Sequence, residues 1–203
     1  MPGKPELRVG LKDFSDYAKY LKELLLEQDE DTVVKAIGFK ILTATELVSH
    51  VFRELKGQRF GSVNARYGKI EIGEIEMPDQ GIKPSIQIPC RIVREEVEGY
   101  RSLINLSQNP WQCKLEIVDK YWREKLENYF PVLADKKWIN LYGPGNHVVD
   151  AIKVFNILRK RMPSLDVTYQ YVELGYRPHY QSSPNIDYKR ENMPCIKIAV
   201  TAK

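Results

Sequence analysis

The apolar pattern of one predicted helix recurs 107 residues further along the chain. Five apolar residues with the three- and four-residue spacing of one helix face lie in the first half: Ile41, Ala44, Val48, Val51 and Leu55. The same spacing returns in the second half at Val148, Ala151, Phe155, Leu158 and Met162. Spacing that repeats more faithfully than residue identity indicates two related folding units in one chain.

The repeated helix belongs to the same order of predicted elements in both halves. A strand leads into a helix over 14–27 or 121–133, and a short strand, a glycine turn, the long helix and two more strands follow. We therefore predict an α/β (α+β) fold of two tandem βαβαββ domains, 1–107 and 108–203. The segment GYRSLINLSQNPWQ joins them.

A glycine precedes the long helix in each half, at Gly38 and Gly145. A strand that turns sharply into a helix needs positive φ, which glycine adopts without strain. The turn also leaves helix N–H groups without partners, and these can bind a phosphate. A role in the turn alone explains the two glycines equally well.

Composition and charge limit the classes of protein that this chain can be. The 203 residues include three widely spaced cysteines and no signal-peptide pattern, so we expect a soluble intracellular protein that does not enter a membrane. Residues 1–107 contain 16 Lys and Arg with 17 Asp and Glu, whereas residues 108–203 contain 15 and 10. The second half is therefore the more basic one.

The residues VVKAIG followed by an apolar helix resemble the VIKARG core of the Alba superfamily, small nucleic-acid-binding proteins of archaea and eukaryotes. The resemblance extends over both halves and implies a tandem Alba-like protein, in which two domains that usually dimerise form a pseudo-dimer. Its eukaryotic relatives would include the ciliate macronuclear-development type and the protein subunits of RNase P and MRP. It implies RNA or DNA binding in the nucleus or cytoplasm, without catalysis, cofactor or metal.

In this family the binding residues lie at the end of the first strand, around the glycine turn and on the last hairpin. Carried over by position, the first two regions predict nucleic-acid contacts from Lys12, Lys35, Lys40, Lys120, Gly145, Asn146 and His147. The arginines that often flank the turn glycine in the family are replaced by Ile37, Phe39, Pro144 and Asn146. This departure argues against strong nonspecific coating of duplex DNA.

The last hairpin of the second half interleaves aromatic and cationic residues. Its predicted nucleic-acid contacts are Arg177, His179, Tyr180, Tyr188, Lys189 and Arg190. Cations neutralise phosphates and aromatic rings stack on unpaired bases, so this composition favours single-stranded or looped RNA. The matching loop of the first half carries Glu76 and Asp79 instead, and we therefore predict that the second hairpin is the main contact. Alternatively, the tyrosines pack on their own sheet and the charges only solvate the loop.

Two other function classes are consistent with the sequence. One is a structural subunit of a ribonucleoprotein or chromatin complex, in which the first domain docks a protein partner. The other is an enzyme, but the three histidines are scattered and no nucleotide-cleaving or hydrolase motif occurs. We therefore predict a binding protein rather than an enzyme. We expect a monomeric pseudo-dimer, although higher oligomers are compatible with the sequence.

Overall fold

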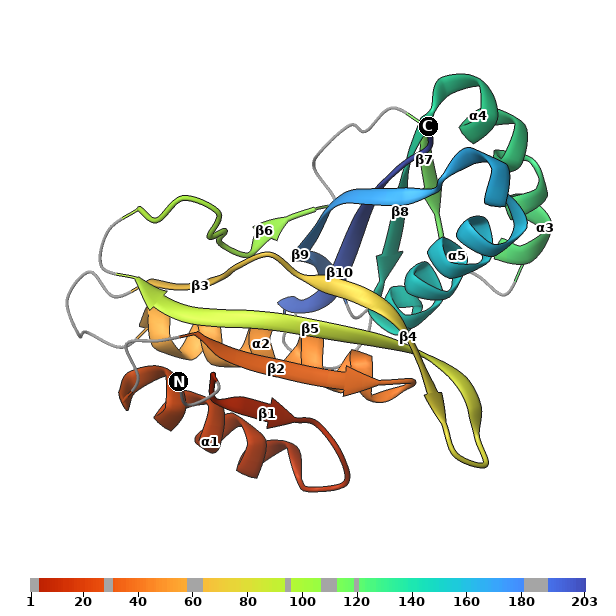
Figure 1. Ribbon diagram of the computed structural model, residues 1–203. Helices are drawn as coiled ribbons and strands as arrows, with labels where there is room; N and C mark the ends of the chain where they lie inside the picture. Colours follow the sequence, from red (N-terminus) through yellow and green to blue (C-terminus); the bar gives the residue numbers. More distant parts are fainter. Residues whose placement is uncertain are drawn as a thin grey trace. The chain divides into compact units, whose positions relative to one another are not determined.

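The computed structural model describes residues 4–27, 31–57, 64–93, 96–106, 113–118, 121–180 and 190–203 (Figure 1). The chain divides into two compact units, Met1–Leu103 and Ile104–Lys203. The boundary expected between 107 and 108 lies outside the described residues. Within the described part of the chain, no helix is both long and apolar enough to span a membrane.

In its described residues, unit 1 has two helices and one mixed sheet. Its elements are β1 (Glu6–Arg8), α1 (Phe14–Glu27), β2 (Thr32–Ile37), α2 (Lys40–Gly57), β3 (Asn64–Tyr67), β4 (Glu71–Met77) and β5 (Gly81–Val93). β1 is parallel to β2, and β2 is antiparallel to β5. β3 and β4 pair with successive segments of β5, and both are antiparallel to it. Together they therefore correspond to one interrupted strand.

The core of unit 1 lies between the helices and one face of this sheet. Burial alternates along β2 and β5, as it does in a strand with one face covered. All five members of the predicted helix stripe, Ile41 to Leu55, are buried. The periodicity therefore identified the core face of α2.

Unit 2 repeats this topology with small additions. Its elements are β6 (Ile104–Asn105), β7 (Lys114–Glu116), α3 (Trp122–Glu127), α4 (Tyr129–Lys136), β8 (Trp138–Pro144), η1 (Gly145–His147), α5 (Val148–Arg161), η2 (Pro163–Leu165), β9 (Thr168–Tyr180) and β10 (Arg190–Thr201). The sheet order is β6-β9-β10-β8-β7, with β7 parallel to β8. Without the short β6, this is the order and orientation found in unit 1. The predicted fold class, two βαβαββ units, is confirmed.

Two sequence-based details of unit 2 are corrected. The single helix expected over 121–133 is two helices, α3 and α4, that meet at Asn128. The break places Pro131 in the first turn of α4, where its missing N–H is tolerated. Met162 is the one member of the second stripe that is not buried, because α5 ends at Arg161 and Met162 caps it.

Candidate functional site

The β2–α2 turn of unit 1 requires a glycine because of its backbone conformation. Gly38 has a φ of +61°, and a Cβ at this position would meet no heavy atom within 4 Å. The Gly38 N–H donates to the Pro84 carbonyl oxygen at 2.8 Å, which ties the turn to the start of β5. The helix begins at Lys40, and its first turn carries no acidic residue. The positive end of the helix dipole is therefore not opposed by a carboxylate in this turn, although the Ile41 and Leu42 N–H groups already donate to the Gly38 and Phe39 carbonyl oxygens.

Three connections meet at one end of the unit 1 sheet. Since β1 and β2 are parallel and β5 is antiparallel to β2, the β1–α1 loop, the β2–α2 turn and the β4–β5 hairpin share this end (Figure 1, toward the right). Each presents an exposed apolar residue: Leu11 is 93% exposed, Phe39 74% and Ile82 57%. A lysine follows each of them in the sequence, at Lys12, Lys40 and Lys83. We call these six residues the three-loop end.

Within the three-loop end, the turn itself contains a cation–π pair. The Lys40 Nζ lies 5.0 Å from the centroid of the Phe39 ring. A nucleotide base can stack on an exposed aromatic ring, and an ammonium group beside that ring can contact the phosphate of the same nucleotide. Sequence reasoning identified Lys12 and Lys40 but treated Phe39 only as a departure from the family pattern. The sequence contained a signal for Phe39, because a large aromatic residue directly follows the turn glycine.

Lys35 lies apart from the three-loop end. It lies within β2, paired with Arg8 in register, and its ammonium contacts the carboxylate of Glu6 on β1. This hydrogen bond from Lys35 lowers the pKa of Glu6 below its usual value. The positive charge of Lys35 is therefore partly neutralised within the sheet.

The corresponding turn of unit 2 is more crowded. Gly145 has a φ of +54°, and a Cβ there would lie 2.7 Å from the Met193 Sδ. Gly143 is tighter still, because its Cβ would lie 2.3 Å from the His147 carbonyl oxygen and 2.9 Å from the Ala151 Cβ. Sequence reasoning missed Gly143, although YGPG contains two glycines and a second one before a helix indicates close packing.

Asp150 places a carboxylate in the first turn of α5. Its carboxylate lies 3.3 Å from the His147 Nδ1 and 3.1 Å from the Lys153 Nζ. A carboxylate in the first helical turn already interacts with the positive end of the helix dipole, and it repels a phosphate there. Asn146 is exposed, whereas Gly145 is buried. Of the two turns, the one in unit 1 is therefore better suited to a phosphate.

The described part of the second hairpin contains only some of the predicted contacts. Arg177 is exposed on β9, and its Nη1 lies 3.5 Å from the Glu116 Oε1. Arg190 pairs with Tyr180, and Glu191 pairs with His179, so the two strands are in register as far as the described residues extend. The side chains of His179, Tyr180 and Arg190 lie outside the described structure, as do Lys120, Tyr188 and Lys189 entirely.

Comparisons with known proteins complete the description of the chain. A scan against protein-family models finds no matching family. A search of curated proteins finds no match. Among solved structures, the chain is similar to Alba from Thermoplasma volcanium, with 18% sequence identity and a TM-score of 0.35. The similarity covers 42% of this chain and 98% of that chain.

Proposed function

We propose that the protein binds nucleic acid in the manner of Alba proteins, without catalysing a reaction. The observation that carries the proposal is the three-loop end, where three separate connections each present an exposed apolar side chain followed by a lysine. Isolated exposed apolar residues are common and need no explanation, whereas exposed apolar residues that gather at one end of a sheet mark an interaction surface. The twofold occurrence of the βαβαββ order agrees with the resemblance found in the sequence.

The chemistry of the three-loop end favours unpaired nucleotides. Phe39 offers an aromatic face for a base, and Lys12, Lys40 and Lys83 offer ammonium groups for phosphates. The first turn of α2 beside Phe39 adds the positive end of the helix dipole without an acidic residue of its own. Base stacking and phosphate contacts make no hydrogen bonds to the edges of the bases. We therefore expect the binding to have a weak sequence preference.

The second hairpin, which the sequence predicts to be the main contact, stays a proposed contact on the other unit, because most of its predicted contact residues lie outside the described structure. Arg177 lies near the end of β9 and Arg190 begins β10, and Tyr188 and Lys189 come directly before Arg190 in the sequence. Its composition also suits single strands. We expect each surface to contribute its own salt-dependent share of the binding free energy.

The experiment measures binding of the full chain to single- and double-stranded RNA and DNA over a salt series. Phe39→Ala is expected to weaken single-strand binding by about 1–3 kcal/mol with little change in salt slope. Replacing Lys12, Lys40 and Lys83 together by Gln should lower the single-strand slope by roughly 2, at about 0.7 per lost phosphate contact. The matched control replaces Lys19, Lys56 and Lys69, which are exposed lysines of the same unit.

A structural subunit is the second candidate function, and the same surface favours it. The exposed side chains of Leu11, Phe39 and Ile82 are also what a protein partner would cover. The two functions differ in salt dependence, because apolar docking releases few counterions. If the triple Lys→Gln variant and Phe39→Ala bind nucleic acid like the control variant, the three-loop end is not the nucleic-acid surface and the second hairpin is left as the proposed contact. If the full chain binds none of the four nucleic acids even at low salt, the nucleic-acid proposal is wrong and the subunit function is favoured.

A further inference from the structure

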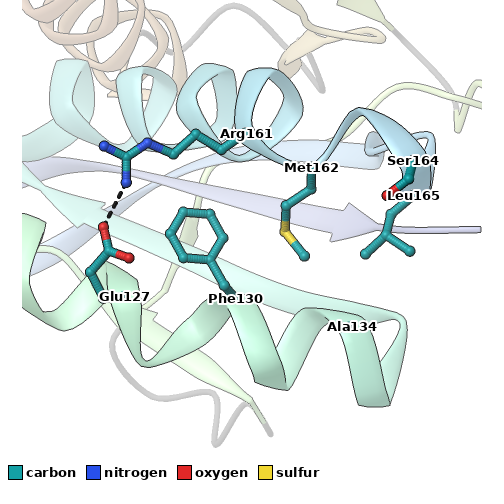
Figure 2. A pocket seen from close by; sticks show the side chains of 7 residues that line it. All are labelled: Glu127, Phe130, Ala134, Arg161, Met162, Ser164 and Leu165. Carbon is teal, nitrogen blue, oxygen red and sulfur yellow. Dashed lines mark hydrogen bonds and ion pairs between the residues drawn. The ribbon is translucent and has the colours of Figure 1, made fainter.

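Unit 2 has an open groove between α4 and the C-terminal end of α5 (Figure 2). Its volume is about 530 Å³, within the range of ligand sites. The lining residues are Glu127, Phe130, Ala134, Arg161, Met162, Ser164 and Leu165. We call it the α4–α5 groove. It lies entirely within unit 2 and includes none of the residues proposed to contact nucleic acid.

The floor of the groove is apolar and only partly covered by the protein. Phe130 and Ala134 lie four residues apart on α4 and therefore share one helix face. Met162 and Leu165 approach from the other side, where Pro163 ends the helical path of α5. Phe130, Met162 and Leu165 are half-buried, so their outer surfaces are available to an apolar side chain from another molecule.

One end of the groove is closed by an ion pair. The Arg161 Nη1 donates to the Glu127 Oε1 at 2.6 Å, and the guanidinium lies 5.8 Å from the Phe130 ring centroid (Figure 2). The two side chains are 58% and 62% exposed. An ion pair this exposed contributes little net stability, so a carboxylate from a ligand can replace Glu127 on Arg161 at small cost. The planar guanidinium then binds that carboxylate through two N–H donors.

The segments around the groove carry a small positive net charge, and two of their cations, Arg161 and Lys136, are paired with Glu127 and Asp135. Residues 127, 134–137 and 159–166 include five Lys or Arg and three Asp or Glu. Three of the cations, Arg159, Lys160 and Arg161, form the last turn of α5. Such a rim favours approach of an acidic segment and disfavours a basic one.

We propose that the α4–α5 groove is a docking site for an acidic segment of a partner protein. An apolar side chain of that segment packs on Phe130, Met162 and Leu165, and a neighbouring Asp or Glu binds Arg161. Helix α5 has 14 residues and is therefore about 20 Å long, with the groove at its C-terminal end and Gly145 before its N-terminal end. A partner in the groove thus leaves the glycine turn accessible, and this inference does not depend on nucleic-acid binding.

The first test uses two synthetic peptides of about twelve residues, a length that suits a groove of this kind. One carries Phe and Leu among Glu residues, and the other has Lys in place of every Glu. Each is titrated into the isotope-labelled full chain while amide chemical shifts are recorded. We expect saturable shifts centred on Phe130, Ala134 and Leu165 with the acidic peptide, and at least about tenfold weaker binding of the basic one. Equal binding of the two peptides, or shifts centred elsewhere, overturns the proposal.

Variants then test the charged part and the apolar part of the proposed contact separately. Arg161→Gln should weaken the acidic peptide about fivefold, whereas Lys153→Gln, earlier on the same helix, should not. Ala134→Gln adds a longer side chain at an exposed helical position facing the groove and should also weaken the peptide. If Arg161→Gln and Lys153→Gln behave alike, the charge contact is wrong. If an RNA oligonucleotide displaces the acidic peptide, the groove is a nucleic-acid site and the docking proposal fails.

Discussion

The carbonyl oxygen of His147 lies 2.3 Å from the position that a Cβ on Gly143 would occupy. Real Cβ atoms do not approach a carbonyl oxygen this closely, so the first turn before α5 and the end of β8 can pack together only through a glycine. The Ala151 side chain closes the same space from the next helical turn. The observed packing of α5 against β8 therefore requires a residue without a side chain at position 143.

Gly143→Ala is therefore expected to destabilise unit 2 by about 3 kcal/mol, because the helix backbone must move away from β8. All three tryptophans lie in the second half of the chain, so their fluorescence during urea unfolding reports on unit 2. Gly38→Ala is the comparison variant. It meets no neighbour but adopts a strained φ, and it should cost about 1 kcal/mol, measured on unit 1 by hydrogen exchange. Equal unfolding midpoints for Gly143→Ala and the parent would contradict the crowding argument.

Lys35 and Lys40 should differ in their effect on nucleic-acid affinity. Lys35 is paired with Glu6, whereas the Lys40 ammonium lies beside the exposed Phe39 ring. We expect Lys40→Gln to lower the salt slope of single-strand binding by about 0.7 and Lys35→Gln to lower it less. A Lys35→Gln effect equal to that of Lys40→Gln would place Lys35 in direct contact with phosphate.

Lys35→Gln should also change the titration of Glu6. The hydrogen bond from Lys35 lowers the pKa of Glu6, so the ion pair stabilises the folded chain above the ordinary glutamate pKa and is lost as the pH falls through the lowered one. Removing Lys35 should therefore raise the Glu6 pKa toward its model-peptide value, as followed by carboxyl carbon shifts in NMR. An unchanged Glu6 titration would show that the contact is absent in solution.

The fold could be predicted from the sequence because its determinants are local. The apolar stripe of α2 and the glycines before both long helices follow from residue spacing alone, and the structure has them where they were expected. The pairing of Lys35 with Glu6 joins residues 29 positions apart, which no local pattern reveals. The role of Gly143 depends in the same way on how closely α5 packs on β8.

The candidate site was predicted only in part for a related reason. Lys12 and Lys40 were recognised by position, but the exposure of Leu11, Phe39 and Ile82 depends on how far three connections extend beyond the sheet. An apolar residue in a sequence is normally assigned to the core. The groove beside Arg161 could not be predicted, because its lining comes from α3, α4 and the end of α5, which only the folded chain brings together.

The three cysteines should differ in reactivity toward a thiol reagent. Cys90 and Cys195 are buried, and burial raises the pKa of Cys195 to about 11, so at pH 8 this thiol is protonated as well as shielded. Cys113 is partly exposed. We expect one thiol to react rapidly in the native protein and three in denaturant, with Cys113→Ser removing the rapid phase. Rapid reaction of two or more thiols in the native chain would contradict the described burial.

The second hairpin should contribute to binding with a signature that separates charge from stacking. Replacing Arg177, Lys189 and Arg190 by Gln should reduce the single-strand salt slope, with about 0.7 for each full phosphate contact. Arg177 lies 3.5 Å from Glu116, so part of its charge is already compensated, and we expect it to contribute the least of the three. Tyr180→Ala and Tyr188→Ala should instead weaken binding by roughly 1–3 kcal/mol per stacked base while the slope stays constant.

If hairpin and three-loop variants lower the slope additively, both units contact the same strand. An unchanged affinity and slope in every hairpin variant would leave the three-loop end as the nucleic-acid surface.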